Sequence, residues 1–297
     1  MRVFVTGATG FIGSRVVPEL IAAGHSVLGL TRSEAGAAAL TAAGAQPHRG
    51  DIYDLESIRS GAAQADAVIH LAFNHDFSKF QENCETDRRV IETLGATVRP
   101  GQPLLVTSGT GMGSAQPGQL ITENDPPLSS KIVARAASEE AALAAASRGV
   151  RVGIVRLPQV HDTVKQGLVT YAIQIARAKG VAAYIGEGRN RWPAAHVTDV
   201  AHLYRLALEK AADRAIWHAV AEEGVPVRTM AEAIGRGLNI PAVSITPEEA
   251  PAYFGWLASF AGWDIAASSA QTRAQLGWNP AGPNLITDLN HMDYTPL

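Results

Sequence analysis

The fold is decided by the stretch Arg2-Val3-Phe4-Val5-Thr6-Gly7-Ala8-Thr9-Gly10-Phe11-Ile12-Gly13. Its first residues form the short apolar run that is typical of a strand buried on both faces of a sheet. A helical pattern then runs over residues 14–23. Glycines at this spacing, between a strand and a helix, let the chain turn tightly and bring free backbone N–H groups toward a diphosphate. The stretch therefore predicts a dinucleotide site, and we expect contacts from Gly7, Thr9, Gly10, Phe11, Ile12 and Gly13.

The same alternation of strand and helix continues along the chain. We expect further strands at 26–30, 46–48, 67–71, 104–107 and 151–156, and helices at 35–43, 55–63, 82–98 and 134–147. Six such repeats in about 156 residues predict an α/β fold with a doubly wound parallel sheet, the Rossmann arrangement. After Pro158 the alternation loosens, which indicates a smaller C-terminal substrate lobe. We expect the dinucleotide domain at 1–157, with about 190–220 returning to it and a last strand at 215–219. Residues 158–189 and 221–297 then form the lobe.

Composition excludes several classes of function. The formal net charge of −3 gives no basic surface for nucleic acid, so we expect none as a partner. No apolar run approaches the roughly 20 residues of a membrane helix, and the early turn at Thr6-Gly7 does not fit a signal peptide. The single cysteine, Cys84, fits a reducing compartment. We expect a cytoplasmic protein without a membrane anchor and, since the histidines lack ligand spacing, without a metal.

The end of the second strand indicates which ribose is bound. An acidic residue there accepts hydrogen bonds from a free 2′-hydroxyl, whereas an arginine pairs with a 2′-phosphate. The residues are Thr31, Arg32 and Ser33. Arg32 offers a bidentate phosphate contact and its neighbours offer hydroxyls, so the sequence favours NADP. NAD is the alternative, with Arg32 as a solvated surface residue.

Several motifs resemble the extended and atypical short-chain dehydrogenases/reductases, the superfamily that includes nucleotide-sugar epimerases and dihydroflavonol-type reductases. The likeness rests on residues 6–13, 50–54, 66–72, 156–160, 195–201 and 276–280, in that order. The resemblance implies that Asp51 and Ile52 hold the adenine. It also implies that the segment at the end of the fourth strand lies under the cofactor. The segment after the sixth strand is implied to contact the nicotinamide carboxamide, and Asn83 is implied to have a structural role. The further cofactor contacts expected on this basis are Leu71, Ala72, Phe73, Thr107, Pro158 and Val160.

The chain departs from this family in the catalytic centre. The family carries a Tyr-x-x-x-Lys pair one helical turn apart, in which the lysine lowers the pKa of the proton-donating tyrosine. None of the six tyrosines here has a lysine four residues later. Aligning on Glu140 places Val133 and Ala137 in the two positions, so both are empty. The family's serine position falls on Gly109.

Other polar groups are therefore the candidates for proton transfer. Ser108 and Thr110 follow the fifth strand, His161 follows the sixth, and His75 follows the fourth. The carboxyl ends of these strands share one edge of the sheet, where ligands bind in such folds. Each residue also has a structural alternative, a loop hydroxyl or imidazole that satisfies nearby backbone. Lys131 and Arg135 are candidates for holding the cofactor ribose, or are surface charges at a helix start.

Late aromatic residues in 251–263 form either an apolar lid over the substrate or the core of the lobe. The leading hypothesis is an NADP-dependent reductase of a small aldehyde or ketone with a non-standard proton donor. The alternatives are a nucleotide-sugar epimerase or dehydratase, which depends most on the missing tyrosine, and a non-catalytic NADP-binding redox sensor. The sequence leaves the oligomeric state open. The resemblance offers a homodimer as one possibility, because the family often dimerises through the helices that span about 82–98 and 134–147 here.

Overall fold

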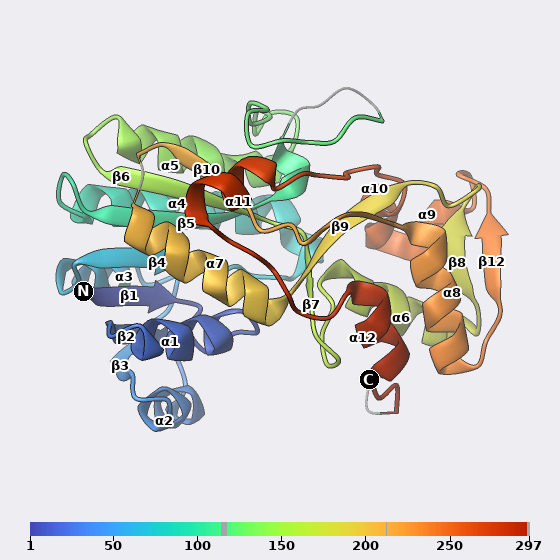
Figure 1. Cartoon of the computed structure of the whole chain (residues 1–297), viewed down its shortest axis with the longest axis horizontal. Helices are drawn as coiled ribbons and strands as arrows, with labels where there is room; N and C mark the ends of the chain where they lie inside the picture. Colours follow the sequence, from blue (N-terminus) through green and yellow to red (C-terminus); the bar gives the residue numbers. More distant parts are fainter. Residues whose placement is uncertain (114–117, 212, 296–297) are drawn as a thin grey trace.

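The computed structural model describes residues 1–113, 118–211 and 213–295. Its largest feature is a seven-stranded parallel sheet with the order β10-β6-β5-β4-β1-β2-β3 (Figure 1). The strands are β1 (Arg2–Thr6), β2 (Ser26–Thr31), β3 (Gln46–Arg49), β4 (Ala67–His70), β5 (Pro103–Gly109), β6 (Arg151–Leu157) and β10 (Ala215–His218). The chain winds one way from β1 to β3 and the other way from β4 to β10. The strand order therefore reverses between β1 and β4, which is where such sheets open a ligand crevice.

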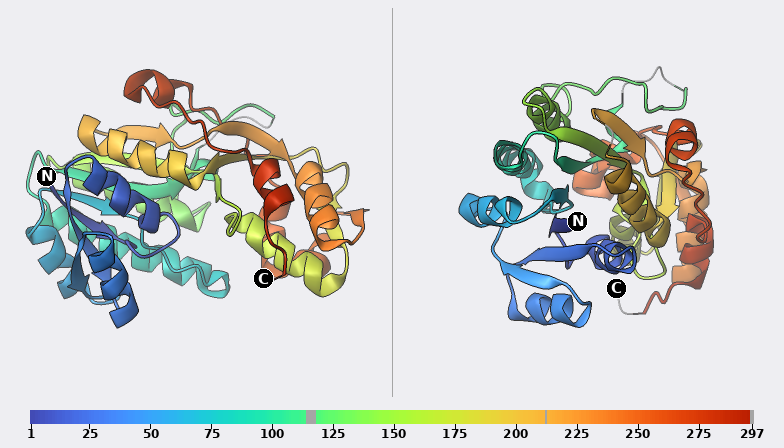
Figure 2. Two further views of the ribbon diagram at one scale, coloured as in Figure 1. Left: turned by 60° about the horizontal axis from the view of Figure 1, so that its bottom comes forward. Right: turned by 60° about the vertical axis from the view of Figure 1, so that its left-hand side comes forward.

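Helices cover both faces of this sheet (Figure 2). One face carries α1 (Gly13–Ala22), α2 (Glu34–Ala42) and α7 (Val197–Lys210), and the other carries α3 (Leu55–Ala63), α4 (Phe80–Thr97) and α5 (Ala137–Ala146). Strand β1 shows why its sequence is apolar throughout. Val3 and Val5 join the core beneath α1 and α7, whereas Phe4 joins the core beneath α3 and α4. The predicted doubly wound α/β fold is confirmed.

The expected elements are found with small shifts of their ends. Helix α3 has the predicted bounds, whereas β5 continues through Gly109, two residues beyond the prediction. The loop after β5 therefore begins with a 3-10 turn, η2 (Thr110–Met112). Residues 114–117 of that loop lie outside the described residues. Two more short turns, η1 (Phe77–Lys79) and η3 (Ala134–Ala136), precede α4 and α5.

The smaller lobe holds two small sheets. One contains β7 (Gln159–His161), β9 (Arg191–His196) and β11 (Glu222–Pro226), and the other pairs β8 (Ala182–Ile185) with β12 (Ala242–Ile245). Its helical segments are α6 (Leu168–Lys179), α8 (Val227–Leu238), α9 (Ala250–Phe254), η4 (Gly255–Leu257), α10 (Ala258–Ala261) and α12 (Leu285–His291).

The chain passes between the two parts more than once (Figure 1). The returning segment consists of α7 and β10, while β9, at the start of the expected 190–220 segment, lies in the sheet of the lobe. Near the end of the chain, α11 (Ala270–Leu276) packs beside α7 and β10 of the large sheet, and α12 then packs against α8. In the parts of the chain that the structure describes, no helix combines the length and the apolar character needed to span a membrane.

Candidate functional site

A cavity of about 680 Å³ lies at the carboxyl ends of the strands around the β1/β4 reversal. The large sheet forms one side of it and the lobe forms the other. Of the residues predicted to contact a cofactor, all but Ser33 line this cavity. They are Gly7, Thr9, Gly10, Phe11, Ile12, Gly13, Thr31, Arg32, Asp51, Ile52, Leu71, Ala72, Phe73, Thr107, Pro158 and Val160.

The glycine turn after β1 is shaped by close backbone contacts. Gly7 has φ +67°, and a Cβ atom there would lie 2.8 Å from the backbone nitrogen of Ala72. A Cβ atom on Gly13 would lie 2.1 Å from the carbonyl oxygen of Gly7. Both positions therefore require glycine, because any side chain would push α1 away from β1.

The start of α1 fits an anionic group. No side chain caps this helix among the described residues, whereas Ser33 caps α2 and Asp54 caps α3 with side-chain oxygens. The first N–H groups of a helix need partners, and an uncapped N-terminus with its positive dipole end is suited to a phosphate. The residues present thus fit the diphosphate of a dinucleotide.

The end of β2 provides one exposed cation. The Arg32 side chain is 80% exposed at the cavity, with a guanidinium nitrogen 3.7 Å from Oδ2 of Asp51. Thr31 is buried, and its hydroxyl donates to the carbonyl of Ser33 at 3.5 Å. Because the Ser33 hydroxyl accepts from the N–H of Gly36 and lies outside the cavity lining, Arg32 is the main group at this end of the cavity able to bind a ribose phosphate.

A buried polar network supports the floor of the cavity. The hydroxyl of Thr6 accepts from the N–H groups of Leu71 and Ala72, both at 3.2 Å, and lies 2.7 Å from Nδ1 of His70. On the other side of the ring, Nε2 of His70 lies 2.9 Å from Oδ1 of Asp87. This network fixes the end of β4 against β1, where the resemblance places the cofactor.

Arg135, from η3, completes the network and lines the cavity. Its guanidinium donates to Oδ2 of Asp87 at 2.8 Å and to the carbonyl of Thr107 at 2.9 Å, and it stacks 4.4 Å above the ring of Phe73. Burial would raise the pKa of Asp87, but Arg135, His70 and Ser138 outweigh burial and lower that pKa to about 2. Arg135 is therefore a fixed cation at the carboxyl end of β5 rather than a solvated surface charge.

The two expected Tyr and Lys positions hold no proton-transfer group. Val133 lines the cavity, and Ala137 is buried at the start of α5. Arg135 stands between them. The start of α5 is anchored by Glu139, which accepts two hydrogen bonds of 2.9 Å from the fully buried Arg156 of β6.

Two hydroxyls stand at the end of β5. Ser108 is 4% exposed and lines the cavity, and its Oγ has no hydrogen-bond partner among the described residues. Thr110 also lines the cavity, and its hydroxyl donates a long 3.4 Å bond to the carbonyl of Leu157. An unpaired buried hydroxyl costs about 1–3 kcal/mol. Of the three residues with such an unpaired buried atom in the described parts of the chain, Ser108, His161 and Trp217, Ser108 is the one that lines the cavity.

His75 lies in the cavity wall, with its ring edge-on to Phe73 at 5.4 Å and to Phe77 at 6.1 Å. Its surface faces the open cavity, yet protein surrounds it closely. This crowding, together with the charges of Lys165 and Arg135, lowers its pKa below the ordinary value of 6.5. The imidazole is therefore neutral near pH 7, which weakens its candidacy as a general acid.

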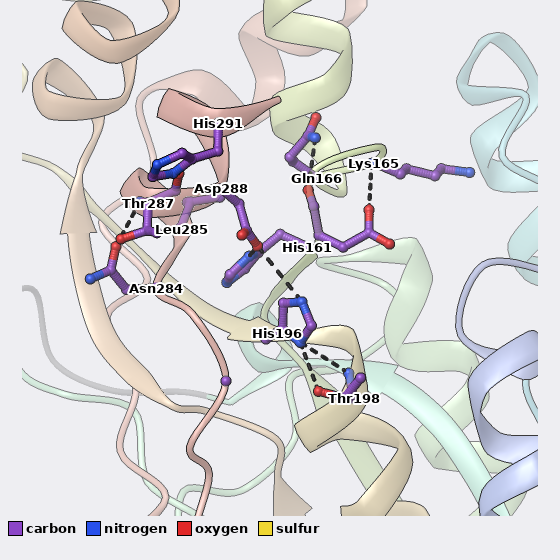
Figure 3. Close-up of polar contacts among 12 residues, drawn as sticks. His161, Lys165, Gln166, His196, Thr198, Asn284, Leu285, Thr287, Asp288 and His291 are labelled. Carbon is purple, nitrogen blue, oxygen red and sulfur yellow. Dashed lines mark hydrogen bonds and ion pairs between the residues drawn. The ribbon is translucent and has the colours of Figure 1, made fainter. Parts of the chain in front are cut away.

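His161 is not among the residues that line the cavity. The ring is fully buried in β7, and its Nδ1 donates to Oδ2 of Asp288 in α12 at 2.6 Å. Burial lowers its pKa. His196 of β9 flanks the same carboxylate at 3.9 Å (Figure 3). His161 thus joins the C-terminal helix to the lobe and is not brought together with Ser108 and His75.

The remaining cavity wall contains residues that the sequence did not indicate. Lys165, in the loop before α6, places its ammonium 5.9 Å from the centre of the Phe11 ring, and no ion pair with it is found among the described residues. Tyr171 of α6 and Phe77 of η1 also line the cavity. They lie on segments far apart in the sequence, so no local pattern could have grouped them.

Both expectations for 251–263 apply in part. Phe254 and Leu257 are buried in the core of the lobe, whereas Phe260 and Trp263 line the cavity.

Within 1–113, 118–211 and 213–295, no three His, Cys, Asp or Glu side chains are arranged to hold a metal ion.

Fold and site together define a dinucleotide-binding protein of the extended short-chain dehydrogenase/reductase type. The family model described as "NAD dependent epimerase/dehydratase family" matches residues 3–219. An uncharacterized protein of Schizosaccharomyces pombe is 48% identical over 97% of this chain and 98% of its own length. An uncharacterized protein of Saccharomyces cerevisiae is 41% identical with the same coverage. The UDP-glucose 4-epimerase of Thermus thermophilus, solved in complex with NAD, shares the fold with a TM-score of 0.75 and 20% identity, over 100% of this chain and 99% of that chain.

The chain belongs to the NAD-dependent epimerase/dehydratase family, within the extended short-chain dehydrogenase/reductase superfamily. This is a family of NAD(P)-dependent enzymes.

Proposed function

We propose that this protein is an NAD(P)-dependent reductase of a small aldehyde or ketone, in which Ser108 takes the place of the tyrosine as hydrogen-bond donor to the substrate. The observation that carries the proposal is that Ser108 lines the cavity and that its buried Oγ lacks a partner among the described residues. A substrate carbonyl oxygen would accept its hydrogen bond and remove the cost of the unpaired group.

The bound cofactor supplies hydride to the carbonyl carbon. The Ser108 hydroxyl donates to the carbonyl oxygen as negative charge develops there, and passes on the proton that completes the alcohol, which it regains from water in the open cavity.

Two observations support NADP as the preferred cofactor in this proposal. Arg32 is exposed at the cavity, and the end of β2 carries no carboxylate. NAD is the alternative. Dimerisation through α4 and α5 and a cytoplasmic location also stay predictions.

The test is oxidation of NADPH and NADH with a panel of small aldehydes and ketones. We expect turnover, and we expect Ser108→Ala to lower kcat by about 100-fold, the cost of losing one donor to a developing oxyanion. The dissociation constant of the cofactor should change by less than about twofold, because Ser108 is proposed to contact the substrate.

Ser60→Ala is the matched control, since Ser60 lies in α3 outside the cavity lining. Unchanged kinetics in Ser108→Ala would remove Ser108 from the mechanism. Saturable cofactor binding without turnover of any carbonyl would support the redox-sensor alternative instead. Interconversion of nucleotide sugars would support the epimerase.

A further inference from the structure

The end of the cavity away from the glycine turn has a wall of aromatic rings. It consists of Phe77, Phe80, Tyr171, Phe260 and Trp263, which we call the aromatic wall. The rings of Phe77 and Phe80 are stacked with centroids 5.7 Å apart. Tyr171 meets Phe77 at 5.6 Å, and Phe260 meets Phe80 at 5.9 Å and Trp263 at 5.2 Å, all edge to face. The rings therefore form one continuous surface rather than scattered contacts.

The aromatic wall is supported from outside the cavity. Trp256 of η4 stacks on Phe77 with a centroid distance of 4.3 Å and an angle of 4° between the rings, and it meets Tyr171 at 5.1 Å. Trp256 does not line the cavity. This second layer holds the wall residues in place, although they come from both the large sheet and the lobe.

These rings are not core residues. All five are only half-buried, whereas Trp217 and Trp278 of the core are 1% and 2% exposed. All five wall residues line the cavity. Large aromatic surface left open in a cavity is a feature of ligand sites and is otherwise unfavourable in water.

The charges around the cavity disfavour a second phosphorylated ligand there. The cations that line it are Arg32, Arg135 and Lys165. Arg32 lies at the β2 end, and Lys165 lies beside Phe11 of the glycine turn. The charge of Arg135 is neutralised by Asp87 at 2.8 Å. Among the described residues, neither Lys165 nor Arg135 stacks on a ring of the aromatic wall, so the rings themselves offer a nucleotide diphosphate no cationic partner.

We propose that the aromatic wall binds the ring of a flat, uncharged aromatic aldehyde or ketone, with the carbonyl group directed to Ser108. Offset and edge-to-face contacts favour an aromatic ring over a saturated ring of equal size by about two- to twelvefold in affinity per pair. The reaction of the proposed reductase then converts an aryl carbonyl into the corresponding alcohol, with the hydride on carbon and the proton on oxygen. The placement of the carbonyl group at Ser108 rests on the proposed function. The recognition of the aromatic ring rests on the aromatic wall alone.

Two amides test the wall without any reaction. Benzamide and cyclohexanecarboxamide have the same number of heavy atoms and the same polar group, and neither is reduced. We expect the protein saturated with NADP⁺ to bind benzamide about tenfold more tightly, measured by calorimetry and by quenching of tryptophan fluorescence. Phe77→Leu and Phe260→Leu should reduce this ratio to about two.

Phe254→Leu is the matched control, because Phe254 lies in the same segment but is buried in the core of the lobe. It should retain the tenfold ratio, and thermal melting should show that all three variants are folded. Equal binding of the two amides by the unaltered protein would overturn the inference. UDP that binds at the wall and displaces benzamide would also overturn it.

Kinetics separate this inference from the proposed function. A higher kcat/KM for benzaldehyde than for cyclohexanecarbaldehyde, by about tenfold, would support both. Equal values for the two aldehydes would contradict the aromatic preference while leaving the reductase intact. Tight benzamide binding with no reduction of any carbonyl would contradict the reductase while leaving the wall intact.

Discussion

The two ends of the cavity are built in different ways. The cofactor end consists largely of backbone from neighbouring turns, held by glycines and by the uncapped start of α1. The substrate end consists of side chains from η1, α4, α6, α10 and the segment after α10, which meet only in the folded molecule. Sites that recognise a ligand through local backbone leave a motif in the sequence. Sites assembled from distant side chains do not.

The difference also concerns polar groups. The cofactor end lies over a saturated network in which Thr6, His70, Asp87 and Arg135 all have partners. The substrate end has an unpaired hydroxyl on Ser108 and open aromatic faces. The polar groups beneath the cofactor end are therefore all hydrogen-bonded before a ligand binds. At the substrate end, we propose that the ligand supplies the partner that Ser108 lacks.

The largest expected effect is on the network beneath both ends. Asp87→Asn should lower the free energy of unfolding at pH 7 by about 3–5 kcal/mol, because Arg135 loses the partner of a buried ion pair. Urea unfolding followed by tryptophan fluorescence measures it. Because the pKa of Asp87 is lowered to about 2, its stabilising contribution is complete above the unfolded value of about 3.9. It is lost as the pH falls through about 2.

The stability difference between the protein and Asp87→Asn should therefore be constant from pH 5 to pH 8 and should shrink below about pH 4. Asp76→Asn is the control, since Asp76 is exposed after β4 and should leave the unfolding midpoint nearly unchanged. Equal stability of the two variants at pH 7 would show that the network does not support the floor of the cavity.

A second test concerns the backbone character of the cofactor end. Gly13→Ala should weaken cofactor binding by about 100-fold, because its Cβ would lie 2.1 Å from the carbonyl of Gly7 and would displace α1. Fluorescence titration with NADPH and NADH measures the affinity. Gly262→Ala meets its nearest atom at 3.7 Å and should bind the cofactor normally. Normal affinity in Gly13→Ala would contradict the close contact.

Arg32→Ala tests the one side chain on which cofactor choice is proposed to depend. We expect about tenfold weaker binding of NADPH and little change for NADH, on the scale of one charge-assisted contact. The paired titrations also serve as each other's control. Equal losses for the two cofactors would rule out the 2′-phosphate contact.

The smallest effect is expected at the substrate end. His75→Gln should change kcat by less than about twofold between pH 7 and pH 8, because a pKa lowered below 6.5 keeps His75 neutral there. A pH profile of kcat checks this. The disappearance of a titrating limb in the variant would instead make His75 the general acid.

The sequence predicted local features better than assembled ones. Helix α3 and the glycine turn follow from spacing within a few residues, and the structure has them as predicted. His161 was grouped with Ser108 because both follow strands of the large sheet. Its ring instead points to α12, where Asp288, 127 residues away, accepts a hydrogen bond from Nδ1. Such long-range pairing cannot be read from the pattern around either residue.

Arg135 illustrates the same limit. Its sequence context, a cation before an alanine-rich helix, is equally typical of a solvated helix start. Asp87, the carboxylate that draws it into the cavity wall, comes from α4, 48 residues earlier. The sequence around Arg135 and Asp87 does not indicate this contact. Only the packing of α4 against α5 shows that Arg135 is a fixed cation in the cavity wall and not a solvated charge at a helix start.

The path of the chain limits how this molecule can be dissected. Strand β10 covers the edge of β6 in the large sheet, but it lies in the chain after most of the strands of the lobe, and α11 returns to the same place later still. A fragment cut after β6 would lose both and leave an open strand edge able to pair with other chains. No single cut in the chain separates the dinucleotide domain from the substrate lobe. Exchanging substrate specificity between relatives therefore requires the replacement of single side chains or loops.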